Sequence, residues 1–336
     1  MLIRLLLLAL VLSGILAARS FTDVTGKTIE AELVSLADDK VTISKAGKLF
    51  TLPLANFSTA DQGMIKALAP TQAIPIATIA KIQLAGNELR KNGELNLIEA
   101  PLTEETLKKT RANKDITGIK IAILLPLDFD PAVPHKVLWV SSPINSEADR
   151  TSGNCPAVSN YSNTALAEGW VVIAVDCNLG NPRREDNQAA NFDLPIQHQA
   201  VTMLSAEWPG FAKSQFACAG YSGGSKTSFY RVGQLCTAGL NVVGLFLSGC
   251  NENLTESTKN ETKVRSKDLK KIKVFVSNGK TDEIATVKQG EFVAAGVKKE
   301  FGAVRTETFD GGHSISQEHL KSALAWFLET AASPGK

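Results

Sequence analysis

Residues 215–236 read QFACAGYSGGSKTSFYRVGQLC, and this stretch decides the fold of the larger part of the chain. An apolar run at Gln215–Ala219 is typical of a buried strand, and Ser225–Cys236 is expected to be helical. Between them stands Gly220-Tyr221-Ser222-Gly223-Gly224, which has the pattern G-x-S-x-G. Its small residues permit a sharp strand-to-helix turn that lifts the hydroxyl of Ser222 out of the sheet. An ordinary glycine-rich turn is the alternative, but the strand–turn–helix context favours a nucleophile, with the Gly223 N–H available to an oxyanion.

A serine hydroxyl is a poor nucleophile until a base takes its proton, so a histidine and an orienting acid should follow. Lys271–Ser277 is a predicted strand, and Asp282 follows it in a loop. His313 stands in the loop after the last predicted strand, behind two glycines that let its ring fold over the serine turn. We therefore predict Ser222 as nucleophile, His313 as general base and Asp282 as orienting acid. The alternative for His313 is a loop histidine that caps the last helix.

Other residues compete for these roles. Asp310 is the main alternative acid and Glu283 a weaker one, although we expect the acid to come from a separate loop. Of the other histidines, His135 precedes a strand and His319 lies on the closing helix, where both are expected at the surface. His198 lies on the helix before the serine turn and is expected to be structural.

Short apolar runs alternate with predicted helices in the larger domain. The apolar runs are Ile119–Leu125, Lys136–Val140, Trp170–Val175, Gln215–Ala219, Val242–Leu247, Lys273–Ser277 and Arg305–Phe309. The predicted helices are Ala165–Glu168, Pro195–Glu207, Ser225–Cys236, Val287–Phe301 and Gln317–Thr330. This alternation predicts an α/β domain with a mostly parallel sheet covered by helices on both faces.

The order Ser222, Asp282, His313 along the chain is that of the α/β-hydrolase superfamily, which the sequence resembles from about Gly118 to Leu328. The resemblance is strongest to exported esterases and polyester-depolymerase-like proteins, which carry a segment like Asp128–Pro134 before the corresponding strand. It implies an α/β-hydrolase sheet and acyl transfer to the serine without any metal or organic cofactor.

One stretch departs from the pattern of that superfamily. After the strand at Lys136–Val140 the family normally has a His-Gly or glycine-rich segment that supplies the second oxyanion donor, whereas this chain has Ser-Ser-Pro-Ile-Asn at 141–145. Pro143 has no N–H to donate. The candidates that remain for the second donor, beside Gly223, are Ser142, Ile144 and the side chain of Asn145.

A small β domain is predicted at residues 19–68. Apolar and polar residues alternate in short runs separated by turns, and Ser58 followed by Asp61 predicts the cap of a short helix that reaches toward Leu68. Half-buried strands in so short a segment imply a small barrel.

This segment resembles the SH3-like homology domain first described in a yeast endocytic adaptor and common in exported proteins of planctomycete-type bacteria. The matching residues are Phe21-Thr22-Asp23, Thr25-Gly26, Ala31-Glu32-Leu33-Val34, Lys40-Val41, Gly47-Lys48, Leu52-Pro53-Leu54, Ser58 and Asp61. The adaptor domain binds a short peptide motif, but the ligand of the bacterial copies does not follow from that; a peptide- or polymer-binding role is one interpretation. A spacer without a ligand is the alternative.

Residues 1–18 predict a secretory signal peptide. Arg4 supplies the positive charge, Leu5–Leu16 is almost wholly apolar, and Ala17-Ala18 offers small residues for cleavage. The apolar run is shorter than the ~20 residues that span a bilayer. A retained N-terminal anchor is the alternative.

Residues 69–117 are expected to form a linker and lead-in, and the hydrolase domain to occupy residues 118–332. The stretch 69–80 contains Pro70 and Pro75 and little charge, and Asn87–Asn113 is polar, with a short helix after Thr103.

Composition excludes several classes of protein. The 336 residues include 36 Lys and Arg against 34 Asp and Glu, so no basic surplus supports binding to nucleic-acid phosphates. With 44% hydrophobic and 21% charged residues, the chain can bury a core and is not a disordered polymer.

The five cysteines are an odd number, so at least one is unpaired within the chain. Cys218 lies in an apolar run and is expected to be a small buried hydrophobe. Cys155 and Cys177 are predicted to form a disulfide, because both follow runs expected to be neighbouring parallel strands. No CxxC or His-rich cluster predicts a metal site.

Together these features predict a secreted or periplasmic serine hydrolase that cleaves a carboxylic ester through an acyl-enzyme on Ser222. The expected partners are a small-molecule or polymeric ester, and a peptide or cell-surface ligand of the N-terminal barrel. Nucleic acid, a cofactor and a membrane span after signal cleavage are not expected. The alternatives are a non-catalytic extracytoplasmic binding protein on a hydrolase scaffold, and a peptidase or amidase with the same triad.

Overall fold

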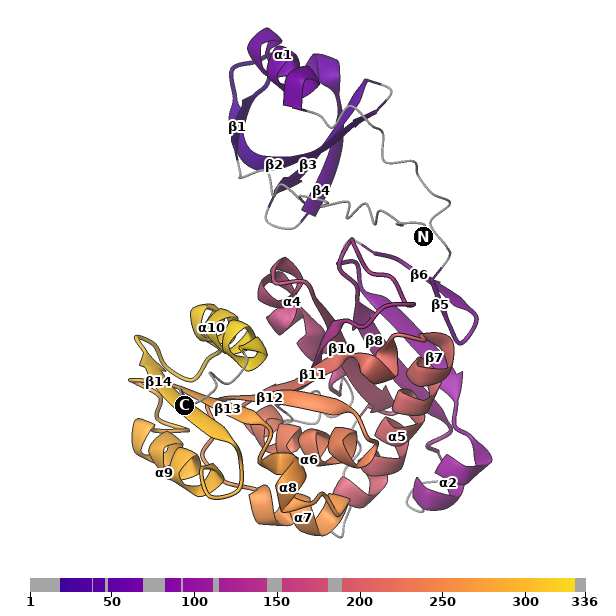
Figure 1. Ribbon diagram of the computed structural model, residues 1–336, viewed down its shortest axis with the longest axis vertical. Coiled ribbons are helices and arrows are strands. Elements are labelled where there is room, and N and C mark those ends of the chain that lie inside the picture. The colour runs from indigo at the N-terminus through magenta and orange to yellow at the C-terminus, as the bar shows by residue number, and fades with distance from the viewer. Residues whose placement is uncertain are drawn as a thin grey trace, which may run out of the picture. The chain divides into compact units, whose positions relative to one another are not determined.

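A computed structural model describes residues 19–37, 39–45, 48–68, 82–91, 93–110, 115–143, 153–180 and 189–329. The chain divides into two compact units, residues 1–80 and 81–336 (Figure 1). The predicted signal peptide at 1–18 and the stretch 69–80 of the predicted linker lie outside the described residues. Among the described helices, none is both long and apolar enough to cross a membrane.

The N-terminal unit is a four-stranded antiparallel sheet in sequential order, followed by helical segments. Its elements are β1 (Arg19–Thr22), β2 (Thr28–Ala37), β3 (Lys40–Lys45), β4 (Lys48–Pro53), the 3₁₀ helix η1 (Leu54–Asn56) and α1 (Thr59–Leu68). Its core consists of Phe21, Ala31, Leu33, Val41, Ile43, Leu54, Phe57 and Ile65. The predicted meander is therefore confirmed for this unit.

The predicted helix cap at Ser58 is also confirmed. The N–H of Asp61 donates to Ser58 Oγ at 3.2 Å, and the Ser58 hydroxyl donates back to Asp61 Oδ2 at 2.8 Å. Asp61 Oδ2 also accepts the N–H of Thr22 at 2.7 Å, so the same carboxylate ties β1 to the start of α1.

The larger unit is built on an eight-stranded sheet in the order β14-β13-β12-β11-β9-β10-β8-β7. Its strands are β7 (Asn96–Pro101), β8 (Gly118–Leu124), β9 (Lys136–Ser141), β10 (Trp170–Cys177), β11 (Gln215–Tyr221), β12 (Asn241–Ser248), β13 (Lys273–Gly279) and β14 (Ala303–Phe309). Only β8 is antiparallel to its neighbours, β7 and β10. The predicted mostly parallel sheet is confirmed.

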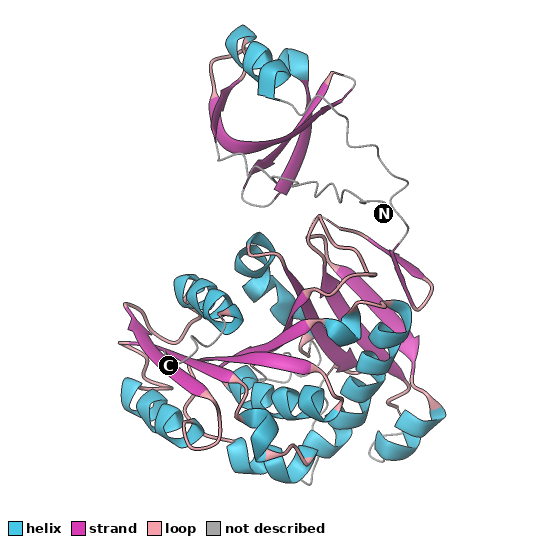
Figure 2. Cartoon of the chain, viewed as in Figure 1, coloured by secondary structure: helices cyan, strands magenta, loops and turns pink. Residues whose placement is uncertain are grey.

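Helices cover both faces of this sheet (Figures 1 and 2). The helical elements are α2 (Glu104–Thr110), η2 (Cys155–Ala157), α4 (Val158–Ala167), α5 (Ala189–Glu207), η3 (Phe211–Lys213), α6 (Gly223–Thr237), α7 (Thr255–Thr262), α8 (Ser266–Leu269), α9 (Val287–Val297) and α10 (Gln317–Leu328). Side chains of α5, α6 and α9 pack into one apolar cluster, and those of α4 and α10 into a second. These two clusters cover opposite faces because successive strand residues, such as Ile173 and Ala174, alternate between them.

The sheet begins earlier in the chain than the sequence indicates. Part of the segment expected to be lead-in forms the edge strand β7, and a separate hairpin of β5 (Ile82–Leu84) and β6 (Asn87–Leu89) precedes it. In β7 the buried positions are Asn96 and Ile98, so the apolar alternation that marks a strand is weak. Asn96 compensates because its Nδ2 donates to the Ile123 carbonyl at 3.2 Å. The short helix expected after Thr103 is confirmed as α2.

The predicted disulfide between Cys155 and Cys177 is wrong, because neither cysteine takes part in a disulfide. Cys155 packs in the cluster that includes Ala174, whereas Cys177 packs with Val175 in the cluster on the other face. The sheet itself therefore separates the two thiols. Cys218 is fully buried, as predicted.

Candidate active site

The turn at Ser222 has the backbone geometry expected of the G-x-S-x-G pattern. β11 ends at Tyr221 and α6 starts at Gly223, which leaves Ser222 with φ 54° and ψ −123°. A Cβ on Gly220 would lie 2.1 Å from the carbonyl oxygen of Gly224, so only glycine fits there. The predicted sharp strand-to-helix turn is present, and its strained central residue is the candidate nucleophile.

The start of α6 places backbone N–H groups beside the serine. The first four N–H groups of an α-helix have no partner inside the helix, and the helix dipole favours negative charge at this end. Gly223 is the first residue of α6, which runs for 15 residues. Its N–H is therefore suited to an oxyanion formed next to Ser222.

Asp282 lies after β13 and its side chain is 1% exposed. Asp282 Oδ1 accepts the N–H groups of Ile284 at 2.9 Å and Ala285 at 2.8 Å. Asp282 Oδ2 lies 2.8 Å from Nδ1 of His313. The loop after β13 thus fixes the carboxylate in one orientation, with one oxygen held by the backbone and the other facing the imidazole.

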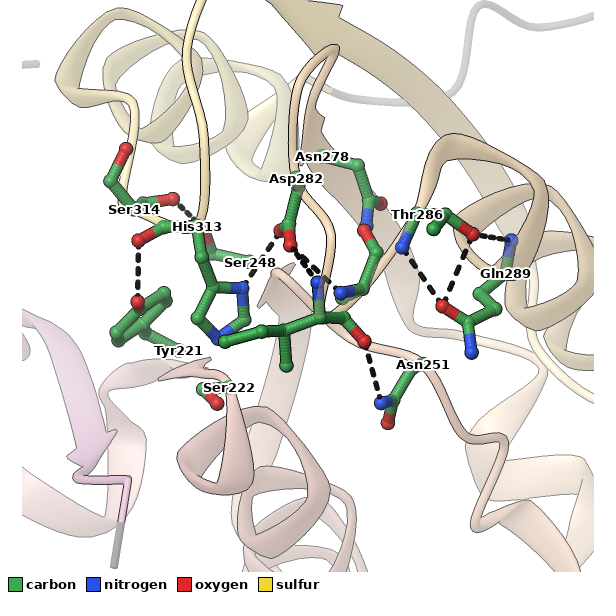
Figure 3. A network of polar contacts seen from close by, with 12 residues as sticks. Tyr221, Ser222, Ser248, Asn251, Asn278, Asp282, Thr286, Gln289, His313 and Ser314 are labelled. Atoms are coloured by element: carbon green, nitrogen blue, oxygen red, sulfur yellow. Dashed lines mark hydrogen bonds and ion pairs between the residues drawn. The ribbon is translucent and has the colours of Figure 1, made fainter. Parts of the chain in front are cut away.

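Figure 3 shows the ring of His313 between Asp282 and Ser222, with Nε2 on the serine side. His313 Nε2 is buried and has no hydrogen-bond partner among the described residues. A Cβ on Gly249 (φ 55°) would lie 2.9 Å from Cε1 of His313, so glycine at 249 leaves room for the ring. The structure therefore brings together the three residues that the sequence analysis selected.

The competing acids lie elsewhere. The Asp310 side chain is 90% exposed and pairs with Lys280 at 2.7 Å, and this hydrogen bond lowers the pKa of Asp310. Glu283 is exposed beside the buried Asp282. The carboxylate in contact with His313 is that of Asp282.

Tyr221 and Gly249 also shape the site, and sequence reasoning missed both. The Tyr221 hydroxyl donates to the His313 carbonyl at 2.6 Å, and the two rings lie 4.8 Å apart (Figure 3). Burial, with a smaller contribution from Asp282, raises the pKa of Tyr221, so its hydroxyl stays protonated as a donor. Tyr221 occupies the variable position of G-x-S-x-G, where no residue type signals a role.

The backbone N–H of Ser142, a candidate from the sequence for the second oxyanion donor, already has a partner. The N–H of Ser142 donates to Oδ1 of the buried Asn154 at 3.0 Å. Pro143 has no N–H, while Ile144 and Asn145 lie outside the described residues. The Ser142 hydroxyl donates to the Pro143 carbonyl at 3.2 Å.

The remaining histidines do not reach this site. His135 stacks on Phe129 at 4.5 Å, and His198 is exposed on α5. His319 was expected at the surface, which is wrong: it is 8% exposed, and its Nδ1 lies 2.9 Å from the hydroxyl of Ser277. Its helix, α10, packs over the sheet rather than standing free, and buries the ring. Within the described ranges, no group of three His, Cys, Asp or Glu residues is arranged to hold a metal ion.

Comparison with protein-family models gives no match, and no curated protein matches the chain. Among solved structures, the chain is similar to one of two fungal esterases from Rhizomucor miehei, with 16% identity over 70% of this chain and 82% of that chain and a TM-score of 0.46. It is similar to a thermostable carboxylesterase cloned from a metagenomic library, with 14% identity, 71% and 90% coverage and a TM-score of 0.48. It is also similar to a bacterial heroin esterase, with 15% identity, 70% and 85% coverage and a TM-score of 0.47.

Proposed function

We propose that the protein is a serine hydrolase that cleaves a carboxylic ester through an acyl-enzyme on Ser222. One observation carries the proposal: His313 bonds Asp282 through Nδ1 at 2.8 Å and turns a buried, otherwise unpartnered Nε2 toward the serine side. A histidine held in this way has the tautomer that can accept a proton at Nε2.

In acylation, Ser222 Oγ attacks the carbonyl carbon of the ester while His313 Nε2 takes the hydroxyl proton. The carbonyl oxygen becomes an oxyanion, which the N–H of Gly223 stabilises. The bond from carbon to the alcohol oxygen then breaks, and the alcohol leaves with the proton that His313 carried. Asp282 stabilises the imidazolium throughout.

In deacylation, a water molecule attacks the acyl carbon and gives a proton to His313. The acid is released when the bond to Ser222 breaks, and His313 returns the proton to the serine oxygen. Because the same steps also cleave an amide bond, a peptidase or amidase is the alternative activity for the same three residues. Turnover of an aryl ester compared with the anilide of the same acyl group separates the two.

A non-catalytic binding protein is the second candidate, because the Ser142 N–H that could serve the oxyanion is already bonded to Asn154. The experiment that decides is labelling with a fluorophosphonate probe, followed by mapping of the tagged peptide. The proposed function requires a tag on Ser222, hydrolysis of short-chain aryl esters, and loss of both in Ser222→Ala. If the folded wild-type protein takes no label and hydrolyses no ester, the hydrolase is excluded and the non-catalytic binding protein is the function that remains.

We also propose that the chain is exported through a signal peptide at residues 1–18, and that residues 19–68 form an SH3-like barrel. The antiparallel sheet with its own apolar core supports the second point. In this proposal the barrel holds the protein to a peptide or a cell-surface polymer and thereby raises the local concentration of ester. A pull-down of cell-wall material by the isolated N-terminal unit tests the binding role.

A further inference from the structure

The chain that follows β9 lies against the serine turn. Ser141 pairs with Gly220 in the parallel ladder of β9 and β11, so Ser142 stands level with Tyr221, one residue before Ser222. A Cβ on Gly224 would lie 2.3 Å from the carbonyl oxygen of Ser141 and 2.8 Å from the carbonyl carbon of Ser142. Ser142 therefore lies against the first turn of α6, which begins directly after Ser222.

The backbone of Ser142 cannot serve the oxyanion, because Asn154 holds its N–H in a fixed orientation. Asn154 Nδ2 donates to Asp176 Oδ1 at 2.8 Å, and the N–H of Cys155 donates to Asp176 Oδ2 at 2.7 Å. A carboxylate only accepts, so the amide of Asn154 must turn its nitrogen to Asp176 and its oxygen to Ser142. Asn154 and Asp176 are 2% and 3% exposed.

The neighbouring glycine indicates how tightly this pair is enclosed. Gly153 has φ 70°, and a Cβ there would lie 2.5 Å from Cγ of Asp176. Because Asp176 accepts from its nitrogen, the buried amide keeps its oxygen on the Ser142 N–H. Breaking that bond would leave a buried amide oxygen unsatisfied, at a cost of about 1–3 kcal/mol.

From this arrangement, and resting on the proposed function, we infer that the Ser142 hydroxyl is the second oxyanion donor. Asn154 and Asp176 are the residues that position it. In the resting protein this hydroxyl donates to the Pro143 carbonyl at 3.2 Å, a long distance for an O–H···O bond. Exchange of this bond for one to a full negative charge is favourable, because charge-assisted hydrogen bonds are shorter and stronger. No proton is transferred in the exchange.

The test compares three serine variants on a soluble short-chain aryl ester. Ser142→Ala is expected to lower kcat by roughly 10²–10³-fold with little change in KM, because the hydrogen bond exists only when the oxyanion does. Ser142→Thr, which keeps a hydroxyl, is expected to recover at least a tenth of the wild-type kcat. Ser141→Ala is the matched control: the adjacent hydroxyl is buried and has no hydrogen-bond partner in the part of the chain that the structure describes, so its removal should leave kcat within about twofold.

A transition-state analogue gives a second readout. An aryl trifluoromethyl ketone forms a hemiketal oxyanion on the serine, so Ser142→Ala should weaken its binding by a factor similar to the loss in kcat. If Ser142→Ala keeps kcat within threefold of wild type, or if Ser142→Thr loses as much as Ser142→Ala while still folded, the hydroxyl is not the donor.

The positioning role has its own test. If Asn154 acts through Ser142, Asn154→Ala should lower kcat, and the double variant with Ser142→Ala should lose no more than Ser142→Ala alone. Additive losses would overturn the positioning role. A folded wild-type protein that neither hydrolyses esters nor takes a fluorophosphonate on Ser222 would remove the proposed function and this inference together, whereas active wild type with unaffected Ser142→Ala removes only the inference.

Discussion

The hydroxyl of Tyr221 donates to the carbonyl oxygen of His313 at 2.6 Å, so the residue before the candidate nucleophile holds the loop that carries the candidate base. The two segments are 92 residues apart in sequence, and this bond joins them beside the imidazole ring. Tyr221 therefore connects the position of the imidazole to that of the serine turn.

Tyr221→Phe should lower kcat by about three- to tenfold, because loss of one hydrogen bond leaves the His313 loop less well held. Steady-state kinetics on an aryl ester checks this. Tyr161→Phe is the matched control: its hydroxyl is buried without a partner among the described residues, and its removal should leave kcat unchanged. Equal kinetics for the two variants would contradict the role given to Tyr221.

Asp282→Asn should lower kcat by roughly 10⁴-fold, because an amide at this position favours the wrong tautomer of His313. Asp310→Asn should change kcat by less than about twofold, since Asp310 makes only an exposed ion pair with Lys280. Both variants are measured after circular dichroism shows that they fold. The reverse ranking would mean that the orienting acid has been misidentified.

Ser222→Gly should unfold at higher urea concentration than Ser222→Ala. With φ 54° and ψ −123°, residue 222 is in a region that suits glycine, and a Cβ there costs about 1–3 kcal/mol. Glycine loses more conformational entropy on folding than alanine, which offsets part of this gain. The expected difference in the free energy of unfolding between the two variants is therefore about 1 kcal/mol. Equal midpoints for the two inactive variants would show that the turn is not strained.

His319 should make stability depend on pH. Burial lowers the pKa of His319 below its ordinary value of 6.5, against a smaller opposing effect of Glu307 and Glu318. The unfolded chain therefore binds a proton that the folded protein resists, so this contribution is complete above about pH 6.5 and is lost as the pH falls below it. The free energy of unfolding should decrease from pH 7.5 to 5.5 more steeply in the wild type than in His319→Gln. If the free energy of unfolding falls with pH at the same rate in both proteins, His319 does not contribute to the pH dependence of stability.

Removal of residues 1–80 should leave turnover of a dissolved aryl ester within about twofold of the full chain, because each unit has its own apolar core and the candidate triad lies beyond position 220. Binding to cell-surface material should be lost. A shortened protein that folds but does not hydrolyse the dissolved ester would show that the N-terminal unit completes the active site.

Sequence patterns predicted the elements that depend on local order. The alternation of apolar runs and helices indicated the sheet, and the parallel strands then bring residues 222, 282 and 313 to one edge because each follows the carboxyl end of a strand. What could not be predicted depends on pairing between distant residues. The bond from the Ser142 N–H to Asn154 and the burial of the His319 side chain between α10 and the sheet leave no periodic signal.

The error over the cysteines has a similar origin. Cys155 and Cys177 belong at the same edge of the sheet but on different faces, and the face depends on the exact register of β10 and on where η2 packs. A shift of one residue exchanges the faces. Edge strand β7 was missed because a buried asparagine replaces one of the apolar residues that would mark it.

The close approach of Gly224 to Ser141 links two segments that evolution would otherwise be free to change separately. Any side chain at 224 would push the end of β9, and with it Ser142, away from α6. Descendants of a common ancestor that acquire alanine at 224 should therefore also differ in length or sequence at 141–143. Coupled substitutions at 224 and 141–143 in related sequences would therefore report how closely α6 approaches the end of β9.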